Sequence, residues 1–336
     1  MKRILIVATG GTIASTQDGH GLAPSVTGRE LAEQVPMISE LCELDFVQPM
    51  NIDSTNMRPR DWLRLAALVD EAWDDYDGFV VLHGTDTMAY TAAALSYLVQ
   101  GSEKPIVLTG SQQPMASPFT DAKLNLYQSV LYACDDGSRD VSVVFGGKAI
   151  AGTRAHKQRT MSFNAFTSTN YPSLAYIRND RIVRAAGLGR LAPEEPRERP
   201  KFFGRLDGRV IVLKLTPGLA PGVLELLKRD YDALVVETFG IGGIPAYGGV
   251  WERAIFDWVG GGRTLVVTTQ VPEEGLDLGV YEVGRPYANH PGILRGGDMT
   301  TEALVAKTMW VLGQTRDPDE VARLFYRPVN FDRSED

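Results

Sequence analysis

Residues 4–15 read Ile4-Leu5-Ile6-Val7-Ala8-Thr9-Gly10-Gly11-Thr12-Ile13-Ala14-Ser15. The apolar, β-branched first half predicts a buried strand, and the two glycines predict a sharp turn that approaches another group closely. Thr12 therefore places a hydroxyl just beyond the end of a buried strand. On this stretch alone the hydroxyl is either a turn residue or a nucleophile, because such turns are common in α/β proteins.

Buried-strand patterns recur along the chain, with helical patterns between many of them. The further strand candidates are Phe79–His83, Ile106–Thr109, Val141–Phe145, Val210–Leu215, Ala233–Glu237 and Thr264–Thr268. This alternation predicts an α/β protein with a mainly parallel sheet covered by helices on both faces. Apolar spacing and capping residues predict helices at Trp62–Trp73, Met88–Gln100 ending at Gly101, Thr301–Leu312 ending at Gly313, and from Pro318 after Asp317.

The regular pattern stops between Gly187 and Gly208, where residues 192–200 are rich in proline and charge. Such a segment predicts an exposed linker. We therefore expect a larger, doubly wound N-terminal domain at 1–190, a linker at 191–208 and a smaller C-terminal α/β domain at 209–336. A second irregular stretch, Ser15–Gly28, is either a surface loop or an active-site lid.

The charge balance disfavours a nucleic-acid partner, since 34 basic residues stand against 42 acidic ones and the net charge is −8. Cys42 and Cys134 lie far apart in the sequence and fit neither a metal spacing nor a disulfide framework, so each is expected to be a buried, reduced thiol. Neither a signal peptide nor a membrane span is expected. We therefore expect a soluble, cytoplasmic protein.

Polar residues follow several of the predicted strands. These groups are Thr9–Thr12, His83–Met88, Thr109–Gln112, Gly146–Lys148 with Arg154–Lys157, and Thr268–Gln270. Because ligands of doubly wound sheets bind beyond the carboxyl ends of the strands, we expect these side chains to gather at one edge. Taken singly, each has an ordinary structural role: Asp86 or Thr87 as a helix cap, His83 as a structural histidine, Lys148 and Lys157 as surface lysines.

The familiar catalytic and nucleotide-binding motifs are missing from the sequence. Gly10-Gly11 does not continue as G-x-G-x-x-G, and Gly147-Lys148-Ala149 lacks the spacing and hydroxyl of a phosphate loop. There is no G-x-S-x-G, no H-E-x-x-H and no Cys/His metal cluster. The chemistry that fits best is a threonine nucleophile activated by a lysine amine and a second threonine, with an acid to hold a cationic substrate.

Residues 6–14 and 78–88 resemble the two signature motifs of the bacterial-type L-asparaginase family, over their full length and in the usual order. Further segments resemble that family: Asn51–Thr55, Thr109–Ser111, Phe163–Phe166, Gly240–Pro245 and Gly297–Thr300. The resemblance spans roughly residues 4–313 and is nearest to the cytoplasmic, type I-like and archaeal-like members. It implies an L-asparagine amidohydrolase that releases aspartate and ammonia, with no metal or organic cofactor.

The resemblance also implies the catalytic residues. Thr12 would attack the side-chain amide carbon of asparagine and form a β-aspartyl ester, which water then hydrolyses. Thr85 and Lys157 would act together as the second threonine and its activating amine.

Substrate binding follows from the same resemblance. Asp86 would hold the α-ammonium group of the substrate, and it counts as both a catalytic and a substrate-binding residue. The α-carboxylate would be bound by Ser54, with Asp53 and Thr55 beside it. Family members complete the site with the C-terminal domain of a neighbouring subunit, which implies a homodimer or homotetramer with Tyr281 as the candidate contact from the partner.

Two positions depart from the family pattern. Leu22, in Gly21-Leu22-Ala23-Pro24, stands where many members carry a tyrosine, and Tyr281, water or backbone are the candidates to replace it. Thr55 stands where some members have glutamine, so selectivity between asparagine and glutamine stays open, since one methylene gives only about 1–3 kcal/mol of discrimination.

Three alternatives follow from these departures and from related proteins. One is a broader glutaminase-asparaginase. Another is the amidase component of an archaeal-type tRNA-dependent amidotransferase, which carries an extra domain before its threonine–glycine motif, whereas here the motif begins at Thr9. The third is a catalytically weak or silent amino-acid-binding homologue.

Overall fold

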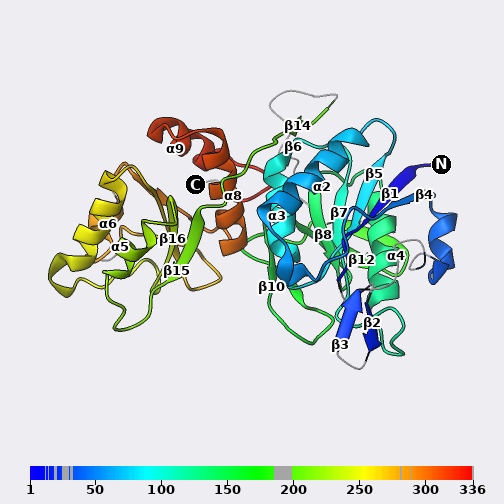
Figure 1. Ribbon diagram of the computed structural model, residues 1–336. Coiled ribbons are helices and arrows are strands. Elements are labelled where there is room, and N and C mark those ends of the chain that lie inside the picture. Colours follow the sequence, from blue (N-terminus) through cyan, green and yellow to red (C-terminus); the bar gives the residue numbers. More distant parts are fainter. Residues whose placement is uncertain are drawn as a thin grey trace. The chain divides into compact units, whose positions relative to one another are not determined.

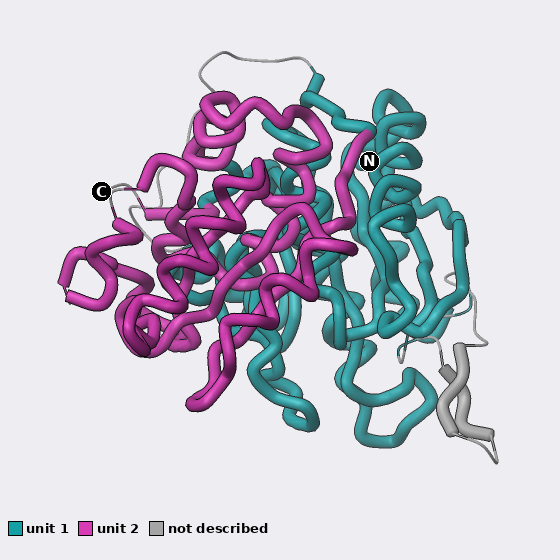
Figure 2. Tube along the Cα trace, turned by 60° about the vertical axis from the view of Figure 1, so that its left-hand side comes forward, with its two compact units in different colours: residues 1–204, 329–331 teal, residues 205–328, 332–336 magenta. Residues whose placement is uncertain are grey.

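The structure is a computed structural model and describes residues 1–11, 13, 15–18, 21–24, 30, 33–184, 199–280, 282–288 and 290–334. Two compact units are present (Figure 2): residues 1–204 with 329–331 form unit 1, and residues 205–328 with 332–336 form unit 2. Much of the predicted linker lies outside the described residues, so the domain boundaries drawn from the sequence stay a prediction.

Unit 1 is built on a sheet whose described strands follow the order β13-β12-β9-β8-β7-β5-β1-β4 (Figure 1). The strands are β1 (Arg3–Ala8), β4 (Glu43–Val47), β5 (Gly78–Leu82), β7 (Ile106–Thr109), β8 (Val141–Phe145), β9 (Lys148–Ala151), β12 (Ala175–Arg178) and β13 (Arg181–Arg184). From β4 to β8 neighbouring strands are parallel, and β9, β12 and β13 extend the sheet in antiparallel fashion. The predicted parallel strands are therefore confirmed, except that the second ends at Leu82 and leaves His83 outside it.

Helices pack on both faces of this sheet. They are α2 (Pro59–Glu71), α3 (Met88–Leu98) and α4 (Ala122–Ala133), with short 3-10 turns η2 (Pro36–Glu40) and η3 (Ser54–Asn56). Helix α4 and η2 bury apolar residues against Val80 and its neighbours. Phe79 points to the opposite face, because successive strand residues alternate, and there it stacks on Trp73. The doubly wound arrangement predicted from the sequence is confirmed.

The described residues of unit 1 form two-stranded ladders in addition to this sheet. They are β2 (Ser15–Asp18) with β3 (Gly21–Pro24), β10 (Ala155–Lys157) with β11 (Phe166–Ser168), and β6 (Val99–Gln100) with β14 (Lys201–Phe202). The first shows that part of the stretch expected to be irregular is a hairpin. The last corrects the predicted end of α3, since Val99 and Gln100 leave the helix to pair with β14.

Unit 2 contains a parallel sheet in the order β15-β16-β17-β18 among its described residues. Its elements are β15 (Val210–Lys214), α5 (Val223–Leu227), β16 (Ala233–Thr238), η4 (Tyr247–Gly249), α6 (Val250–Gly260), β17 (Thr264–Thr269), α7 (Arg285–Ala288), β18 (Ile293–Arg295), α8 (Thr301–Gln314) and α9 (Pro318–Tyr326). Trp251, Ile255 and Trp258 of α6 pack against the apolar residues of β16 and β17. The smaller α/β unit is as expected, although α8 continues through Gly313 instead of ending before it.

Polar contacts hold the residues near the end of the chain. In unit 1, Asn330 donates from Nδ2 to Oγ of Ser96 (2.9 Å) and to the carbonyl of Val141 (2.8 Å). In unit 2, Nζ of Lys307 lies 2.6 Å from Oδ2 of Asp332, and both side chains are fully buried. None of the helices in the described ranges is long and apolar enough to cross a membrane.

Candidate active site

The ends of β1 and β5 carry the two polar segments singled out in the sequence. These strands are parallel neighbours, with Ala8 opposite Leu82. The pairing continues beyond the strands, since Thr9 donates from both its backbone nitrogen (3.0 Å) and Oγ1 (2.9 Å) to the carbonyl of Leu82. The carboxyl ends of adjacent strands thus bring Gly10-Gly11 beside His83-Gly84, as the sequence predicted.

Glycines allow these segments to touch through their backbones. A Cβ on Gly11 would lie 2.4 Å from Cα of Gly84, and a Cβ on Gly84 would lie 2.6 Å from Oγ of Ser54. Gly11 also has a φ of +85°, in the left-handed region that favours glycine. The glycine positions are therefore required by close packing of three chain segments around the residue before Thr85.

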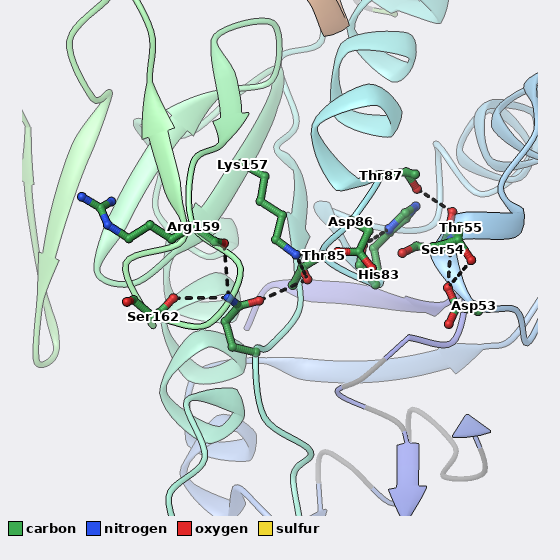
Figure 3. A network of polar contacts seen from close by, with 12 residues as sticks. Asp53, Ser54, Thr55, His83, Thr85, Asp86, Thr87, Lys157, Arg159 and Ser162 are labelled. Carbon is green, nitrogen blue, oxygen red and sulfur yellow. Dashed lines mark hydrogen bonds and ion pairs between the residues drawn. The ribbon is translucent and has the colours of Figure 1, made fainter. Parts of the chain in front are cut away.

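A lysine–threonine–aspartate cluster lies beside this contact (Figure 3). Lys157, the last residue of β10, donates from Nζ to Oγ1 of Thr85 at 2.7 Å and to Oδ1 of Asp86 at 2.6 Å. Thr85 is buried, whereas the Asp86 side chain is 59% exposed. The structure therefore joins an amine to a buried hydroxyl and leaves the adjacent carboxylate accessible.

Gln112 is a contributor that the sequence interpretation did not select. Its Oε1 accepts a hydrogen bond from Oγ1 of Thr85 at 3.2 Å, and its Nε2 donates to the carbonyls of Arg159 (3.4 Å) and Ser162 (3.3 Å). Thr85 thus receives a hydrogen bond from Lys157 and gives one to Gln112 (Figure 3). The sequence does indicate its location, because Gln112 follows β7 and so lies at the same edge of the sheet.

The segment Asp53-Ser54-Thr55 forms a third side of the cluster. Asp53 caps η3, since its Oδ1 accepts from the backbone nitrogen and from Oγ1 of Thr55, each at 2.8 Å. Ser54 is buried, and its carbonyl accepts from Oγ1 of Thr87 at 2.7 Å. The segment is therefore tied to the one that carries Thr85 and Asp86.

His83 lies next to the cluster and is fully buried. Its Nδ1 lies 2.7 Å from the carbonyl of Gly84, and its Nε2 lies 2.8 Å from Oγ1 of Thr91. A carbonyl only accepts, so Nδ1 carries the hydrogen and Nε2 accepts from Thr91, whose oxygen in turn accepts from Nε1 of Trp62 at 2.9 Å. Burial lowers the pKa of His83 to about 4, against the opposing effect of the Gly84 hydrogen bond. The structural interpretation of this histidine is confirmed.

Not every predicted site residue can be placed. Thr12 and Tyr281 lie outside the described residues, and Leu22 lies in β3, where its backbone pairs with Gln17. Thr268 and Thr269 are the last residues of β17, and Gln270 follows it. Because β17 belongs to the sheet of unit 2, the expectation that this group joins the same sheet edge as Thr85 is wrong. The described residues include no group of three His, Cys, Asp or Glu side chains arranged to hold a metal ion.

The chemistry open to this arrangement follows from its groups. An amine in contact with a hydroxyl can move a proton to or from it, which is the requirement for activating an oxygen nucleophile. An accessible carboxylate beside that pair can bind a cation. The cluster therefore combines proton transfer with recognition of a positively charged group.

Comparison with known proteins gives a family for both units. A model of the asparaginase N-terminal domain matches residues 3–186, and a model of the glutaminase/asparaginase C-terminal domain matches residues 209–325. An L-asparaginase of Thermococcus kodakarensis is 38% identical over 97% of this chain and 98% of that protein. A glutamyl-tRNA(Gln) amidotransferase component of Metallosphaera sedula is 33% identical over 96% of this chain and 74% of that protein.

A solved structure agrees with the sequence comparison. The thermostable L-asparaginase from Thermococcus kodakarensis superposes with a TM-score of 0.91 at 37% identity, over 99% of this chain and 100% of that one. Both domain models, a full-length relative and the fold thus agree with the signature segments after β1 and β5. This chain belongs to the asparaginase family.

Proposed function

We propose that the protein is an L-asparagine amidohydrolase that converts L-asparagine and water to L-aspartate and ammonia. The observation that carries the proposal is the contact between Nζ of Lys157 and Oγ1 of Thr85, at 2.7 Å. It supplies the proton-transfer pair that activation of an oxygen nucleophile needs, in a chain whose full-length relative is named an L-asparaginase.

Thr12 is the nucleophile in this proposal. Its oxygen attacks the side-chain amide carbon, ammonia leaves, and the β-aspartyl ester is then cleaved by water. Support comes from the position of Thr12 directly after Gly11, whose backbone packs against Gly84, one residue before Thr85. Thr85 and Lys157 transfer the proton that the hydroxyl of Thr12 loses to the nitrogen that leaves as ammonia.

Asp86 binds the α-ammonium group of the substrate, and Ser54, with Thr55 beside it, binds the α-carboxylate. Asp53 takes part in substrate binding by holding Thr55 through the hydrogen bonds to its Oδ1. In the free chain Asp86 pairs with Lys157 at 2.6 Å. The incoming ammonium competes with Lys157 for this carboxylate, which would leave Nζ of Lys157 in contact with Oγ1 of Thr85 alone. Substrate binding would thus prepare the amine for its role.

A neighbouring subunit completes the site in this proposal, in a homodimer or homotetramer, with Tyr281 as the contact from the partner. This residue is also our candidate to replace the tyrosine missing at position 22. Mass photometry of the purified protein would give the oligomeric state. Tyr281→Phe would lower turnover if the hydroxyl of Tyr281 takes part in proton transfer.

The central test measures ammonia release from asparagine and glutamine side by side, with no added metal, over a range of concentrations. We expect asparagine to be hydrolysed and Thr12→Ala to lose at least about a thousandfold in kcat. Hydroxylamine should intercept the ester as β-aspartyl hydroxamate in the wild type and not in Thr12→Ala. Near-normal turnover by Thr12→Ala would rule out this nucleophile.

A second candidate function rests on the relative named as a component of glutamyl-tRNA(Gln) amidotransferase. Glutamine would then be the better amide donor, and tRNA would bind at physiological salt. The acidic balance of the chain opposes that binding. A filter-binding assay with tRNA separates the two functions, since an amidohydrolase is expected to retain no tRNA on the filter.

A further inference from the structure

Cys42 and Cys134 come together in unit 1 although they are distant in sequence. Cys42 directly precedes β4 and is 2% exposed, whereas Cys134 directly follows α4 and is partly exposed. Both are free thiols, and their side chains hydrogen-bond each other. The expectation of a buried thiol therefore holds for Cys42, whereas Cys134 is only partly buried.

The backbone on each side of this pair is firmly held. Glu43 donates to the carbonyl of Lys2 at 2.9 Å as β4 begins beside β1. Cys134 donates to the carbonyl of Val130 at 2.9 Å as α4 ends. Both cysteines pack in the apolar cluster that joins α4 and η2 to the sheet. The contact between the thiols is therefore set by packed secondary structure.

The two sulfurs differ in their chemical character. Their mutual hydrogen bond is the largest influence on both: it raises the pKa of Cys42 and lowers the pKa of Cys134. Burial opposes the lowering at Cys134, the positive charge of Lys2 reinforces it, and the negative charge of Asp77 opposes it. Cys134 is the more accessible of the two thiols, so an external disulfide reaches it before it reaches the buried Cys42.

We propose that Cys42 and Cys134 form a reversible redox site that is oxidised to a disulfide by small-molecule disulfides such as oxidised glutathione. The Cys134 thiolate attacks one sulfur of the small disulfide, which forms a mixed disulfide and releases one small thiol. Cys42 then loses its proton and attacks the sulfur of Cys134, which forms the protein disulfide and releases the second small thiol. The protein loses two electrons and two protons, and the small disulfide gains both.

The location of the pair predicts what oxidation does. Cys42 and Cys134 lie at the amino-terminal edge of the sheet, since β4 starts beside the first residue of β1, whereas the catalytic cluster follows the carboxyl ends of the strands. The disulfide would close a long loop, from residue 42 to residue 134, and join edge strand β4 to α4. Oxidation should therefore raise thermal stability and leave ammonia release unchanged.

The test oxidises the reduced, full-length protein with oxidised glutathione under native conditions. The protein is then denatured in N-ethylmaleimide and its intact mass is measured. We expect the wild type to lose the mass of two hydrogens, to take up no maleimide and to recover both thiols on reduction. Cys42→Ala should instead keep one glutathionyl group, on Cys134. Cys134→Ala should take up no glutathione, because Cys42 is buried in the folded protein, and should take up one maleimide after denaturation.

The unfolding midpoint of the oxidised wild type should exceed that of the reduced form by about 5–15 °C. A wild type that keeps glutathione on Cys134, or that takes up two maleimides after oxidation, would overturn the proposal. These readouts are of thiols and stability, so they are independent of the proposed amidohydrolase activity.

Discussion

Nε2 of His83 accepts a hydrogen bond from the hydroxyl of Thr91 at 2.8 Å, one turn into the helix that follows the catalytic segment. Because Nδ1 of the same ring donates to Gly84, both nitrogens are used by the neutral imidazole. A second ring proton would abolish the hydrogen bond from Thr91. The fold therefore keeps His83 neutral, next to the segment that contains Thr85 and Asp86.

The free energy of unfolding should decrease as the pH is lowered, because of the His83 ring. The unfolded state takes up a proton near the usual pKa of about 6.5, whereas burial lowers the folded pKa of His83 to about 4. The unfolded state thus binds more protons in that window, so the contribution is complete above about pH 6.5 and is lost towards pH 4. It amounts to about 3 kcal/mol. Urea unfolding at pH 7 and 4.5 should show a smaller loss for His83→Gln than for the wild type; equal losses would contradict the assignment.

Lys157→Met should remove the amine while keeping much of the side-chain volume. We expect kcat for asparagine to fall by about 10²–10⁴-fold, the range for loss of a positioned proton-transfer group. Lys148→Met is the matched control, because Lys148 lies in β9, where it pairs with Phe145 and Tyr176 in the main sheet of unit 1. Steady-state ammonia release measures both, and equal effects of the two substitutions would deny Lys157 a catalytic role.

Gly11→Ala tests the backbone contact with Gly84. The new Cβ would lie 2.4 Å from Cα of Gly84, so the two segments must separate, and we expect a loss of at least about 3 kcal/mol in stability together with most of the activity. Gly101→Ala shares the positive φ, at +73°, but has open space around it. It should cost about 1 kcal/mol from the backbone alone. Chemical denaturation of both variants separates steric contact from strain.

Lys307→Met should destabilise the protein strongly, because it leaves the buried carboxylate of Asp332 without its lysine. The expected cost is about 3–5 kcal/mol in urea unfolding. The control is Lys214→Met, since Lys214 is 60% exposed and lies 3.9 Å from Glu237. Its loss should stay within about 0.5 kcal/mol. Similar costs for both variants would mean that burial does not govern the contribution of the pair.

Much of the fold follows from the sequence because parallel strands are buried on both faces and appear as short apolar runs. Ile4–Ala8 and Val141–Phe145 were predictable for this reason. The linker indicated a separate C-terminal α/β domain, but Thr268–Gln270 were still expected at the edge of the first sheet, since Thr264–Thr268 shows the same pattern as the strands of unit 1. The pairing of Val99 with Phe202 had no signal, because a two-residue strand has no period.

The cluster was only partly predictable, again for physical reasons. Thr85 and Asp86 follow a strand directly, so the rule that ligands bind at carboxyl ends locates them. Lys157 reaches Thr85 from the β10–β11 ladder. The group Arg154–Lys157 was expected at this edge of the sheet, and the resemblance indicated that Lys157 acts with Thr85. Gln112 was expected at the same edge within the group Thr109–Gln112. Its hydrogen bond with Thr85 and the Cys42–Cys134 contact depend on how distant segments pack, which spacing in the chain does not record.

The hydrogen bonds of Asn330 have a consequence for synthesis of the protein. Asn330 belongs to unit 1, where it binds Ser96 and Val141, yet it is translated after almost all of unit 2. When residues 1–204 of a nascent chain have already left the ribosome, Ser96 and Val141 still lack Asn330, which has not yet been translated. Unit 1 therefore reaches its final hydrogen bonding only after its neighbour has been made, so the order of folding is tied to the end of translation.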